Sequence, residues 1–325
     1  MDDLSRSLIN RFQGGLPIVE RPYLHVAAEL GSDEATLIST IQSLLAEGIL
    51  SRFGPLYNAS CMGGGLTLAA LSVCEEDFDR VAEQVNNLPE IAHNYRRQHD
   101  LNMWFVIATE TPQGIHRTID TIGHLTGLPV YNFPKTQEFY LGLWLLLDAD
   151  GGVTTRSIET TTQHGEMVID DLDRKIIQAT QHGLPLLSSP YSKVAAQCGC
   201  DTQTVMSRIR RMLGNGVVRR IGAVPNHYKL GLRSNGMSVW DIPEDRLTIL
   251  GETIGKLDFV SHCYARPPHL PLWPYNLFAM VHGHNREEVN HKVDQITDLL
   301  GSECSQHEVL FSTSILKKSG LRLVA

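Results

Sequence analysis

Several features that would assign the chain to a particular class of protein are missing from its 325 residues. The six cysteines include no CxxC pair, and a chain of this size does not need disulfides to fold, so we expect reduced thiols in a cytoplasmic protein. The polar, charged N-terminus predicts no signal peptide. The longest apolar candidate, residues 141–147, has the length of a strand and is too short to span a membrane.

Positive charge is also in deficit. Lysine and arginine total 28 against 36 acidic residues, and the formal net charge of −8 argues against a protein whose main task is to coat nucleic acid. Histidine, in contrast, is abundant: the 14 histidines favour proton or metal chemistry. The hydrophobic content of 42% is normal for a globular protein, and the length predicts more than one domain.

The second half of the chain repeats the first. The string GLP at 15–17 recurs at 183–185, and VAA at 26–28 recurs at 194–196, both 168 residues later. The same spacing separates Asp33 from Asp201, Gly48 from Gly216, Gly54 from Gly222, and Asn58 from Asn226. The sequence therefore predicts a tandem duplication. The polar, threonine-rich residues 150–168 are the expected linker between the halves.

Each half opens with a pattern typical of a winged helix-turn-helix. Helical spacing of apolar residues in the second half marks three segments, 170–181, 191–198 and 202–213. Asp201 suits the N-cap of the third segment. Residues 217–224 and those that follow predict a β-hairpin wing. We therefore expect winged helix-turn-helix domains at 1–60 and 169–228.

The rest of each half follows the order strand, helix, strand, strand, helix, strand. In the first half these segments are 66–73, 76–86, 91–97, 103–109, 113–126 and 138–147. In the second half they are 234–240, 245–256, 259–266, 275–282, 286–300 and 306–315. This order predicts ferredoxin-like βαββαβ domains at 61–149 and 229–325. The fold class expected is α+β, a tandem duplication of a winged helix-turn-helix plus a ferredoxin-like domain.

Residues 262–283, HCYARPPHLPLWPYNLFAMVHG, hold the densest group of candidate functional side chains. Four prolines between 267 and 274 cannot donate to a sheet, so a loop is predicted between two strands. The candidate site residues are His262, Tyr264, Arg266, His269, Trp273 and Tyr275. Aromatic, cationic and imidazole groups together suit a flat, anionic ligand with an apolar centre.

Residues 93–107, HNYRRQHDLNMWFVI, look like a second version of this site. The matched pairs are His93 with His262, Tyr95 with Tyr264, Arg97 with Arg266, and Asn102 with Asn276. His99 falls near His269, although the loop of the second copy is five residues longer. The sequence thus predicts one site in two unequal forms.

The domain order resembles the Lrp/AsnC family of regulators, and the resemblance covers both halves. Two strings resemble a specialised branch, the siroheme decarboxylases. One is RRIGAV at 219–224 with Asn226 and His227, which is similar to their wing. The other is HCY at 262–264, followed by WPYNLF at 273–278, which is similar to their site loop. The first half lacks a WPYN string but keeps Trp104.

Two unequal halves in one chain resemble the fused two-subunit form of this family, which makes the precursor of d1-type haem. The resemblance implies a lyase that converts two acetate side chains of sirohaem to methyls with loss of two CO2, giving didecarboxysiroheme. It implies no cofactor beyond the iron of the sirohaem substrate. The halves would pair through their βαββαβ sheets, and remaining edge strands could support a homodimer. Other tetrapyrrole-pathway enzymes are further candidate partners, whereas DNA and membrane are not expected.

The expected chemistry fits these residues. Loss of CO2 from a pyrrole acetate needs an electron sink and then a proton for the new methyl, which a histidine can supply. The catalytic candidates are His262, His269, His93 and His99. His262 or His269 could instead be an axial ligand of the substrate iron, and the sequence does not separate the two roles. The substrate-binding candidates are Arg266, Tyr264, Trp273, Tyr275, Arg97, Tyr95, Arg219, Arg220 and His227.

Each candidate also has a purely structural interpretation. The histidines could be satisfied core residues, the arginines charges at a sheet edge, and the aromatic residues core packing. The wing residues Arg219, Arg220 and His227 could simply hold the wing on the βαββαβ domain.

Two other functions remain open. The first is a DNA-binding regulator, for which residues 202–213 offer Arg208, Arg210 and Arg211. The matching residues 34–47 contain no lysine or arginine and two glutamates, so this pseudo-dimer would read palindromic DNA poorly. The second is a non-catalytic tetrapyrrole carrier or sensor, which would use the same pocket without the chemistry.

Overall fold

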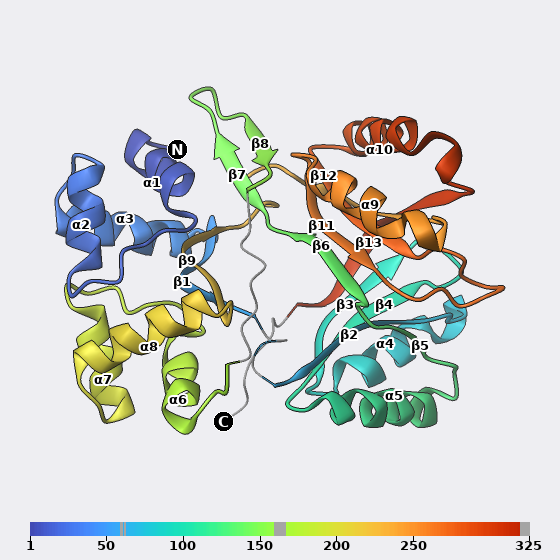
Figure 1. Ribbon diagram of the computed structural model, residues 1–325, viewed down its shortest axis with the longest axis horizontal. Helices are drawn as coiled ribbons and strands as arrows, with labels where there is room; N and C mark the ends of the chain where they lie inside the picture. Colours follow the sequence, from blue (N-terminus) through green and yellow to red (C-terminus); the bar gives the residue numbers. More distant parts are fainter. Residues whose placement is uncertain (59–60, 62, 159–166, 319–325) are drawn as a thin grey trace.

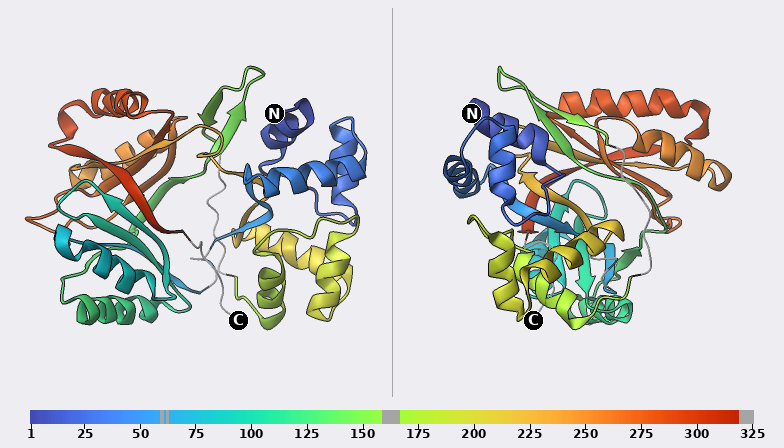
Figure 2. Two further views of the ribbon diagram at one scale, coloured as in Figure 1. Left: turned by 180° about the vertical axis from the view of Figure 1, so that it is seen from behind. Right: turned by 60° about the vertical axis from the view of Figure 1, so that its left-hand side comes forward.

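The computed structural model describes residues 1–58, 61, 63–158 and 167–318. The protein has two layers, a helical layer on the left of Figure 1 and a layer of sheets and helices on the right. Each half of the chain contributes its first part to the helical layer and its second part to the sheet layer (Figure 2). Part of the expected linker, residues 159–166, and residues 319–325 of the last expected domain lie outside the described residues.

The helical layer contains the two expected helix-turn-helix units. The first consists of α1 (Asp3–Phe12), α2 (Pro22–Glu29) and α3 (Glu34–Ala46). The second consists of α6 (Asp171–Thr180), α7 (Pro190–Cys198) and α8 (Thr202–Gly214). The predicted cap at Asp201 is confirmed, because its side chain accepts from Thr204 N at 2.8 Å. Asp33 caps α3 in the same way, accepting from Thr36 N at 2.9 Å.

The wings pair with each other across the repeat. The strand β1 (Leu50–Tyr57) of the first half runs antiparallel to β9 (Val218–Pro225) of the second and forms a separate two-stranded ribbon. The predicted hairpin inside each wing is therefore wrong for the described residues, since each wing offers one strand and takes its partner from the other half. This ribbon and the helices around it share one hydrophobic core.

The centre of the wing ribbon requires glycine. Gly54 and Gly222 face each other in the strand register, with φ of 149° and 157°. A methyl group on Gly222 would lie 2.1 Å from the carbonyl oxygen of Phe12. We expect Gly222→Ala to lower the free energy of unfolding by about 2 kcal/mol or more in urea titrations. Gly214→Ala, where a methyl group meets nothing within 4 Å, is the control, and equal stabilities of the two variants would contradict this account.

The ferredoxin-like order is confirmed in both halves. The first half contains β2 (Gly65–Leu71), α4 (Phe78–Asn86), β3 (Ile91–Arg97), β4 (Met103–Thr109), α5 (Pro112–Thr126) and β5 (Tyr131–Phe133). The second contains β10 (Ser234–Trp240), α9 (Glu244–Gly255), β11 (Val260–Ala265), β12 (Leu277–Gly283), α10 (Arg286–Leu300) and β13 (His307–Lys318).

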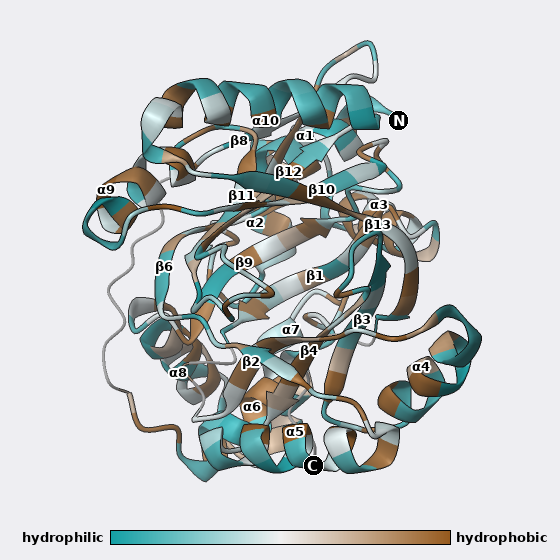
Figure 3. Cartoon of the chain, turned by 90° about the vertical axis from the view of Figure 1, so that its right-hand side faces the viewer, coloured by the Kyte–Doolittle hydropathy of each residue, from teal (hydrophilic) through white to brown (hydrophobic). Residues whose placement is uncertain are grey.

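The two βαββαβ units join into one sheet of order β5-β2-β4-β3-β13-β10-β12-β11-β6, where β6 spans Gln137–Leu141. The halves meet where β3 pairs with β13 and where β11 pairs with β6. The two parts of the sheet face each other, with α9 and α10 outside one and α4 and α5 outside the other (Figure 3). This confirms that the halves pair through their sheets, and it encloses a core that contains Trp104, Phe133, Trp273 and Phe278.

The predicted strand at 138–147 is wrong, because the fourth strand of the first unit is β5, and the chain divides residues 138–147 between two sheets. Its first part is β6, while β7 (Trp144–Leu147) leaves to form a hairpin with β8 (Val153–Arg156) inside the expected linker. The side chains of Asn10 on α1 and of Gln13 at its C-cap bond to the backbone of Leu147 and Leu145, and so tie this hairpin to the helical layer. The division of the chain into domains at 60, 149, 168 and 228 stays a prediction.

Candidate active site between the two sheets

The strands β3 and β11 turn the two copies of the candidate site toward the interior. On β11, His262 and Tyr264 lie opposite Met280 and Phe278 of β12, which pack in the core between the sheets. On β3, His93 and Tyr95 hold the matching places opposite Val106 and Trp104 of β4. Side chains two residues apart on a strand share a face, so both pairs point into the space that the sheets enclose.

The arginines Arg97 and Arg266 occupy equivalent positions. Nη1 of Arg97 donates to the carbonyl of Leu310, and Nη1 of Arg266 donates to the carbonyl of Phe133. Each arginine thereby reaches the last strand of the opposite half. Burial lowers the pKa of both guanidinium groups to about 10, so each remains charged at neutral pH.

The loop histidines are anchored in a similar way. Nε2 of His269 donates to the carbonyl of Asn132 at 2.7 Å, and its ring lies edge-on to Phe133, 4.7 Å between centroids. His99 accepts from Leu101 N at 2.9 Å through Nδ1, and its Nε2 lies 3.4 Å from a carboxylate oxygen of Glu308. Both rings therefore contact the last strand of the other half and lie at the rim of the shared core.

The aromatic residues of the long loop pack in that core. Trp273 is fully buried between Trp104 and Phe278, with ring centroids 5.0 and 5.9 Å away. The hydroxyl of Tyr275 donates to Glu308 at 2.8 Å, and burial with this carboxylate raises the pKa of the phenol. Both residues line the interior next to His99, but their contact with a ligand stays a prediction.

The three wing candidates do not all lie at the same site. Arg219 donates to Asn58 at 3.0 Å and lies 3.6 Å from Glu138, the β6 residue opposite Tyr264. His227 lies 3.4 Å from the side-chain nitrogen of Asn235 on β10, so both of these residues join the second-half site. Arg220 instead bonds to the carbonyl of Leu143 and covers the ring of Trp144, away from that site.

The electrostatics favour neutral histidines in the free protein. Burial, together with Arg219, lowers the pKa of His262 to about 4. Burial and Lys318 lower the pKa of His93 and of His227 to about 4 as well. Burial also holds the pKa of His282 well below its usual value.

The lowered pKa values of these histidines predict a loss of stability in acid. Between pH 6.5 and about 4, the unfolded chain binds protons on these rings that the folded protein does not bind. We therefore expect the free energy of unfolding to fall as pH falls through this window, by up to about 1.4 kcal/mol per pH unit for each histidine. Urea titrations across the window measure it. His93→Gln should give a shallower slope, and a stability that rises as pH falls would contradict the prediction.

Sequence reasoning missed three polar residues behind His262. Ser261 and His282 are buried, and they connect His262 to Asn235 by hydrogen bonds. The sequence contained one indication of these residues. His282 is an imidazole in the otherwise apolar strand FAMVH, and Asn235, opposite it, is also polar.

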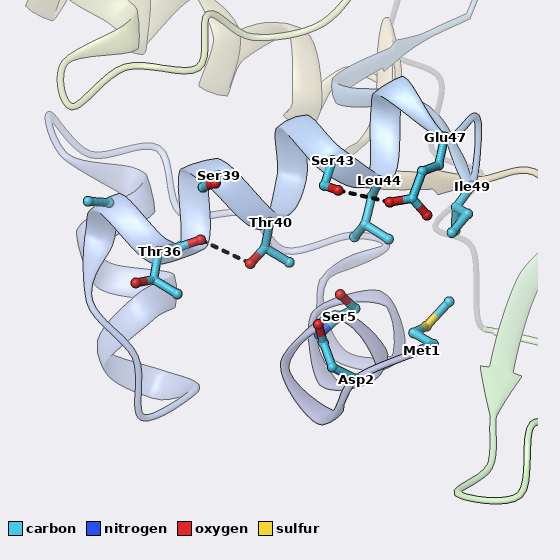
Figure 4. A pocket seen from close by; sticks show the side chains of 11 residues that line it. Met1, Asp2, Ser5, Thr36, Ser39, Thr40, Ser43, Leu44, Glu47 and Ile49 are labelled. Carbon is cyan, nitrogen blue, oxygen red and sulfur yellow. Dashed lines mark hydrogen bonds between the residues drawn. The ribbon is translucent and has the colours of Figure 1, made fainter.

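The arginines of the second expected recognition helix make contacts within the protein. On α8, Arg208 and Arg211 form ion pairs with Asp173 of α6, and Arg210 donates to the carbonyl of Ile18 in the first half. Beside α3, a hollow of about 570 Å³ is lined by hydroxyl, acidic and apolar side chains, with no lysine or arginine (Figure 4). The arginines of α8 thus serve contacts within the protein.

Within residues 1–58, 61, 63–158 and 167–318, no three histidine, cysteine or acidic side chains come close enough to hold a metal ion. In the same residues, no helix has the length and apolar character needed to cross a membrane.

Two family models match the chain, each in both halves. An AsnC-like ligand-binding domain matches residues 64–140 and 229–317. A siroheme decarboxylase NirDL-like HTH domain matches residues 5–50 and 173–219. Together they follow the alternation of helical and sheet parts along the chain.

Curated relatives match at two lengths. The siroheme decarboxylase NirDL subunit of Paracoccus pantotrophus is 30% identical over 98% of this chain and 97% of its own length. The NirH subunit of the same organism is 53% identical over 47% of this chain and 96% of its own length. The NirG subunit of Stutzerimonas stutzeri is 54% identical over 44% of this chain and 97% of its own length.

Solved structures match along the whole chain. A crystal structure of the siroheme decarboxylase NirDL is 27% identical, with a TM-score of 0.72, over 97% of this chain and 92% of that one. A second crystal structure of NirDL, in co-complex with an iron-uroporphyrin III analogue, gives a TM-score of 0.73 at the same identity, over 98% and 93% of the two chains.

Proposed function

The chain belongs to the siroheme decarboxylases of the Lrp/AsnC-like family, and we propose that the inner face of β11 carries its reaction. The chain is a carboxy-lyase that acts on sirohaem, an iron tetrapyrrole. Its reaction removes CO2 from two acetate side chains and leaves methyls, a step that we place in haem d1 biosynthesis. The proposal adds to this activity the residues that perform it.

The observation that carries the site assignment is a set of buried donors in the interior. Nε of Arg97, Nε of Arg266 and Nε1 of Trp273 have no hydrogen-bond partner among the described residues. A buried donor without an acceptor costs about 1–3 kcal/mol of stability, so we expect these groups to have an acceptor when the substrate is bound. Sirohaem carries eight carboxylates, and these are the acceptors that the three donors would suit. The aromatic and aliphatic interior between the sheets would contact the macrocycle.

Charged side chains would contact the substrate carboxylates that the reaction keeps, and apolar side chains would surround those that leave as CO2. Arg266 and Arg219, both near His262, would hold carboxylates that the reaction keeps. Met280 and Phe278, opposite His262 and Tyr264, give a leaving carboxylate apolar surroundings, in which its charge is poorly solvated. When the bond between methylene and carboxyl carbon breaks, CO2 leaves and its electron pair passes to the ring system. A proton then completes the methyl group.

His262 is the proposed proton donor or ligand of the substrate iron. Its pKa near 4 keeps the ring neutral in the free protein. A bound polycarboxylate would raise that pKa, because negative charge nearby favours the imidazolium form. His262 would then be an acid in the complex, or a neutral ligand where the iron lies closer than a carboxylate. His269 lies in the loop that follows β11 and would orient the substrate from the rim.

The first-half site is the less equipped copy. Position 51, which matches Arg219 at a spacing of 168, is a serine. Nδ1 of His93 has no hydrogen-bond partner in the described part of the chain, whereas Nδ1 of His262 contacts Ser261. We therefore propose that the first half holds substrate carboxylates through Arg97 and His99, and that the second half performs both decarboxylations.

The assembly follows from the lengths of the relatives. NirG and NirH subunits match about half of this chain each, and the NirDL subunit matches all of it. We propose that this chain joins in one polypeptide what separate subunits supply elsewhere, and that it works in the cytoplasm. A homodimer or a complex with related subunits, and the absence of any cofactor beyond the substrate iron, belong to the same proposal.

The direct test is anaerobic incubation of the purified protein with sirohaem, followed by mass spectrometry of the tetrapyrrole. We expect a product that has lost two CO2. Binding without a change of mass would favour the carrier or sensor. Neither binding nor a change of mass would contradict the proposal and favour the regulator, to be tested by DNA binding at stated salt.

A further inference from the structure

The strands β3 and β11 share a bulge, but the residues at the bulge differ. The register shifts between Ile91 and His93 on β3, and between Val260 and His262 on β11. The extra residue is an alanine at position 92 in the first half, and Ser261 in the second. A bulge re-aims a side chain, and here it brings the Ser261 hydroxyl beside His262.

A chain of hydrogen bonds begins at this serine. Oγ of Ser261 lies 2.7 Å from Nδ1 of His262 and 2.6 Å from Nε2 of His282. Nδ1 of His282 bonds to the side-chain oxygen of Asn235, whose nitrogen lies 3.4 Å from Nε2 of His227. The chain crosses β11, β12 and β10 and ends at the wing. Ser261 and His282 are 2% and 4% exposed, so water does not compete for these bonds.

The side-chain oxygen of Asn235 determines which atom is the donor in each hydrogen bond from His282 to His262. An amide oxygen only accepts, so Nδ1 of His282 carries a proton. Burial keeps His282 neutral, so its Nε2 accepts, and the Ser261 hydroxyl donates to it at 2.6 Å in preference to the Met280 carbonyl at 3.5 Å. The lone pairs of Ser261 then accept from Nδ1 of His262. Among the described residues this is the one hydrogen bond that the His262 ring makes, and it places the proton of the neutral ring on Nδ1.

We propose that Ser261, His282 and Asn235 are positioning residues that hold His262 in its Nδ1–H tautomer and present the lone pair of Nε2 to the substrate. The inference rests on the proposed role of His262. A bare Nε2 can bind the substrate iron or take up a proton, and it can act as an acid only after taking one up. Before the substrate binds, the His262 imidazole can therefore serve as an iron ligand or as a proton acceptor, but not as an acid.

The first half supplies the internal comparison. Where Asn235 pairs with His282 across β10 and β12, Leu66 pairs with Ala108 across β2 and β4. With an alanine at position 92 as well, all three polar groups are replaced by apolar side chains, and Nδ1 of His93 has no partner in the described residues. The same fold accommodates both versions, so apolar substitutions in the second half are expected to fold.

The test determines by NMR which ring nitrogen of His262 carries the proton. The protein is labelled with 15N-histidine, and long-range 15N–1H correlations show which ring nitrogen is protonated, with His262→Gln assigning the signals. We expect a proton on Nδ1 and none on Nε2 in the wild type. Asn235→Leu, the first-half residue, should release the tautomer. Asn235→Gln should keep it, because its amide oxygen also only accepts and adds no charge beside His282. Ser238→Ala, a buried serine on the other face of β10 that donates to Ala279 O at 2.9 Å, is the control and should match the wild type.

Activity gives the second readout. Asn235→Leu and Ser261→Ala should lower kcat/KM by roughly 10–100-fold, the usual effect of removing a partner that orients a functional histidine, while Asn235→Gln should retain most of it. A proton on Nε2 in the wild type would overturn the proposal. So would an unchanged kcat/KM or an unchanged tautomer in Asn235→Leu. The NMR readout needs no turnover, so it decides the tautomer even if the decarboxylase proposal fails.

Discussion

Replacing His262 by alanine is expected to lower kcat for sirohaem decarboxylation by at least about 100-fold, the low end of what a positioned acid–base group contributes. The ring lies on the interior face of β11, near Arg219 and Arg266, and the Ser261 hydroxyl holds it from behind. A water molecule in its place would lack this support. Binding should weaken less than turnover, since the arginines that hold the carboxylates remain. Anaerobic single-turnover kinetics, with product detected by mass, separate the two effects.

Two variants serve as comparisons for His262→Ala. His291→Ala removes an exposed histidine on α10 and should leave the rate unchanged. His269→Ala removes the loop histidine that bonds to Asn132 and should reduce the rate to an intermediate value. Full activity in both the His262 and the His269 variants would remove the site assignment.

Replacing Trp273 by alanine should have the largest effect on stability. Its ring is fully buried and contacts aromatic rings from both halves, Trp104 on β4 and Phe278 on β12 among them. Truncation of a buried tryptophan costs about 3–5 kcal/mol, because the cavity closes only in part. We expect a loss of this size in the free energy of unfolding from urea titrations.

The matched control is Trp144→Ala. Trp144 lies on β7 under Arg220 and is only half-buried, so its removal should cost clearly less. Equal losses for the two tryptophans would show that the interior between the sheets is not a packed core. A loss below about 1 kcal/mol for Trp273→Ala would contradict its place at the centre of that core.

The fold could be predicted because its signals are local or repeated. The 168-residue spacing of matched strings and the helical periodicity around Asp201 define each unit without knowledge of contacts. The pairing of β1 with β9 could not be predicted in this way. A strand has the same two-residue period whichever strand it pairs with, and here the partner lies in the other half.

The same reason explains the error at residues 138–147. This apolar segment has the composition of one strand, but Leu141 pairs with His262 while Trp144 pairs with Arg156. The chain leaves the first sheet near Gly142, whose amide donates to Ser261 O at 2.8 Å. Composition does not show which of two sheets a strand joins.

The site was predicted in part. The stretch 262–283 and its first-half copy gave the histidines and arginines, and the structure places both sets on interior faces. Sequence could not show that Arg97 and Arg266 reach across to the opposite half, because these contacts depend on the pairing of β3 with β13 and of β11 with β6. It also missed Ser261, His282 and Asn235, which come from three strands and meet only in the folded sheet.

A fused chain permits this asymmetry. Two identical subunits would carry the same residues at Ser261 and Asn235 in both sites, whereas one chain can keep the polar residues in one half and replace them by an alanine and Leu66 in the other. One half can then specialise in the reaction and the other in holding the substrate.

The central claim, that the second half performs the reaction, is tested most directly by the product masses of His93→Ala and His262→Ala after anaerobic incubation with sirohaem. The account predicts that His93→Ala still yields the product that has lost two CO2, and that His262→Ala leaves sirohaem unchanged over the time in which the wild type completes the reaction. If each variant instead stops after losing one CO2, each half carries one decarboxylation and the account is contradicted.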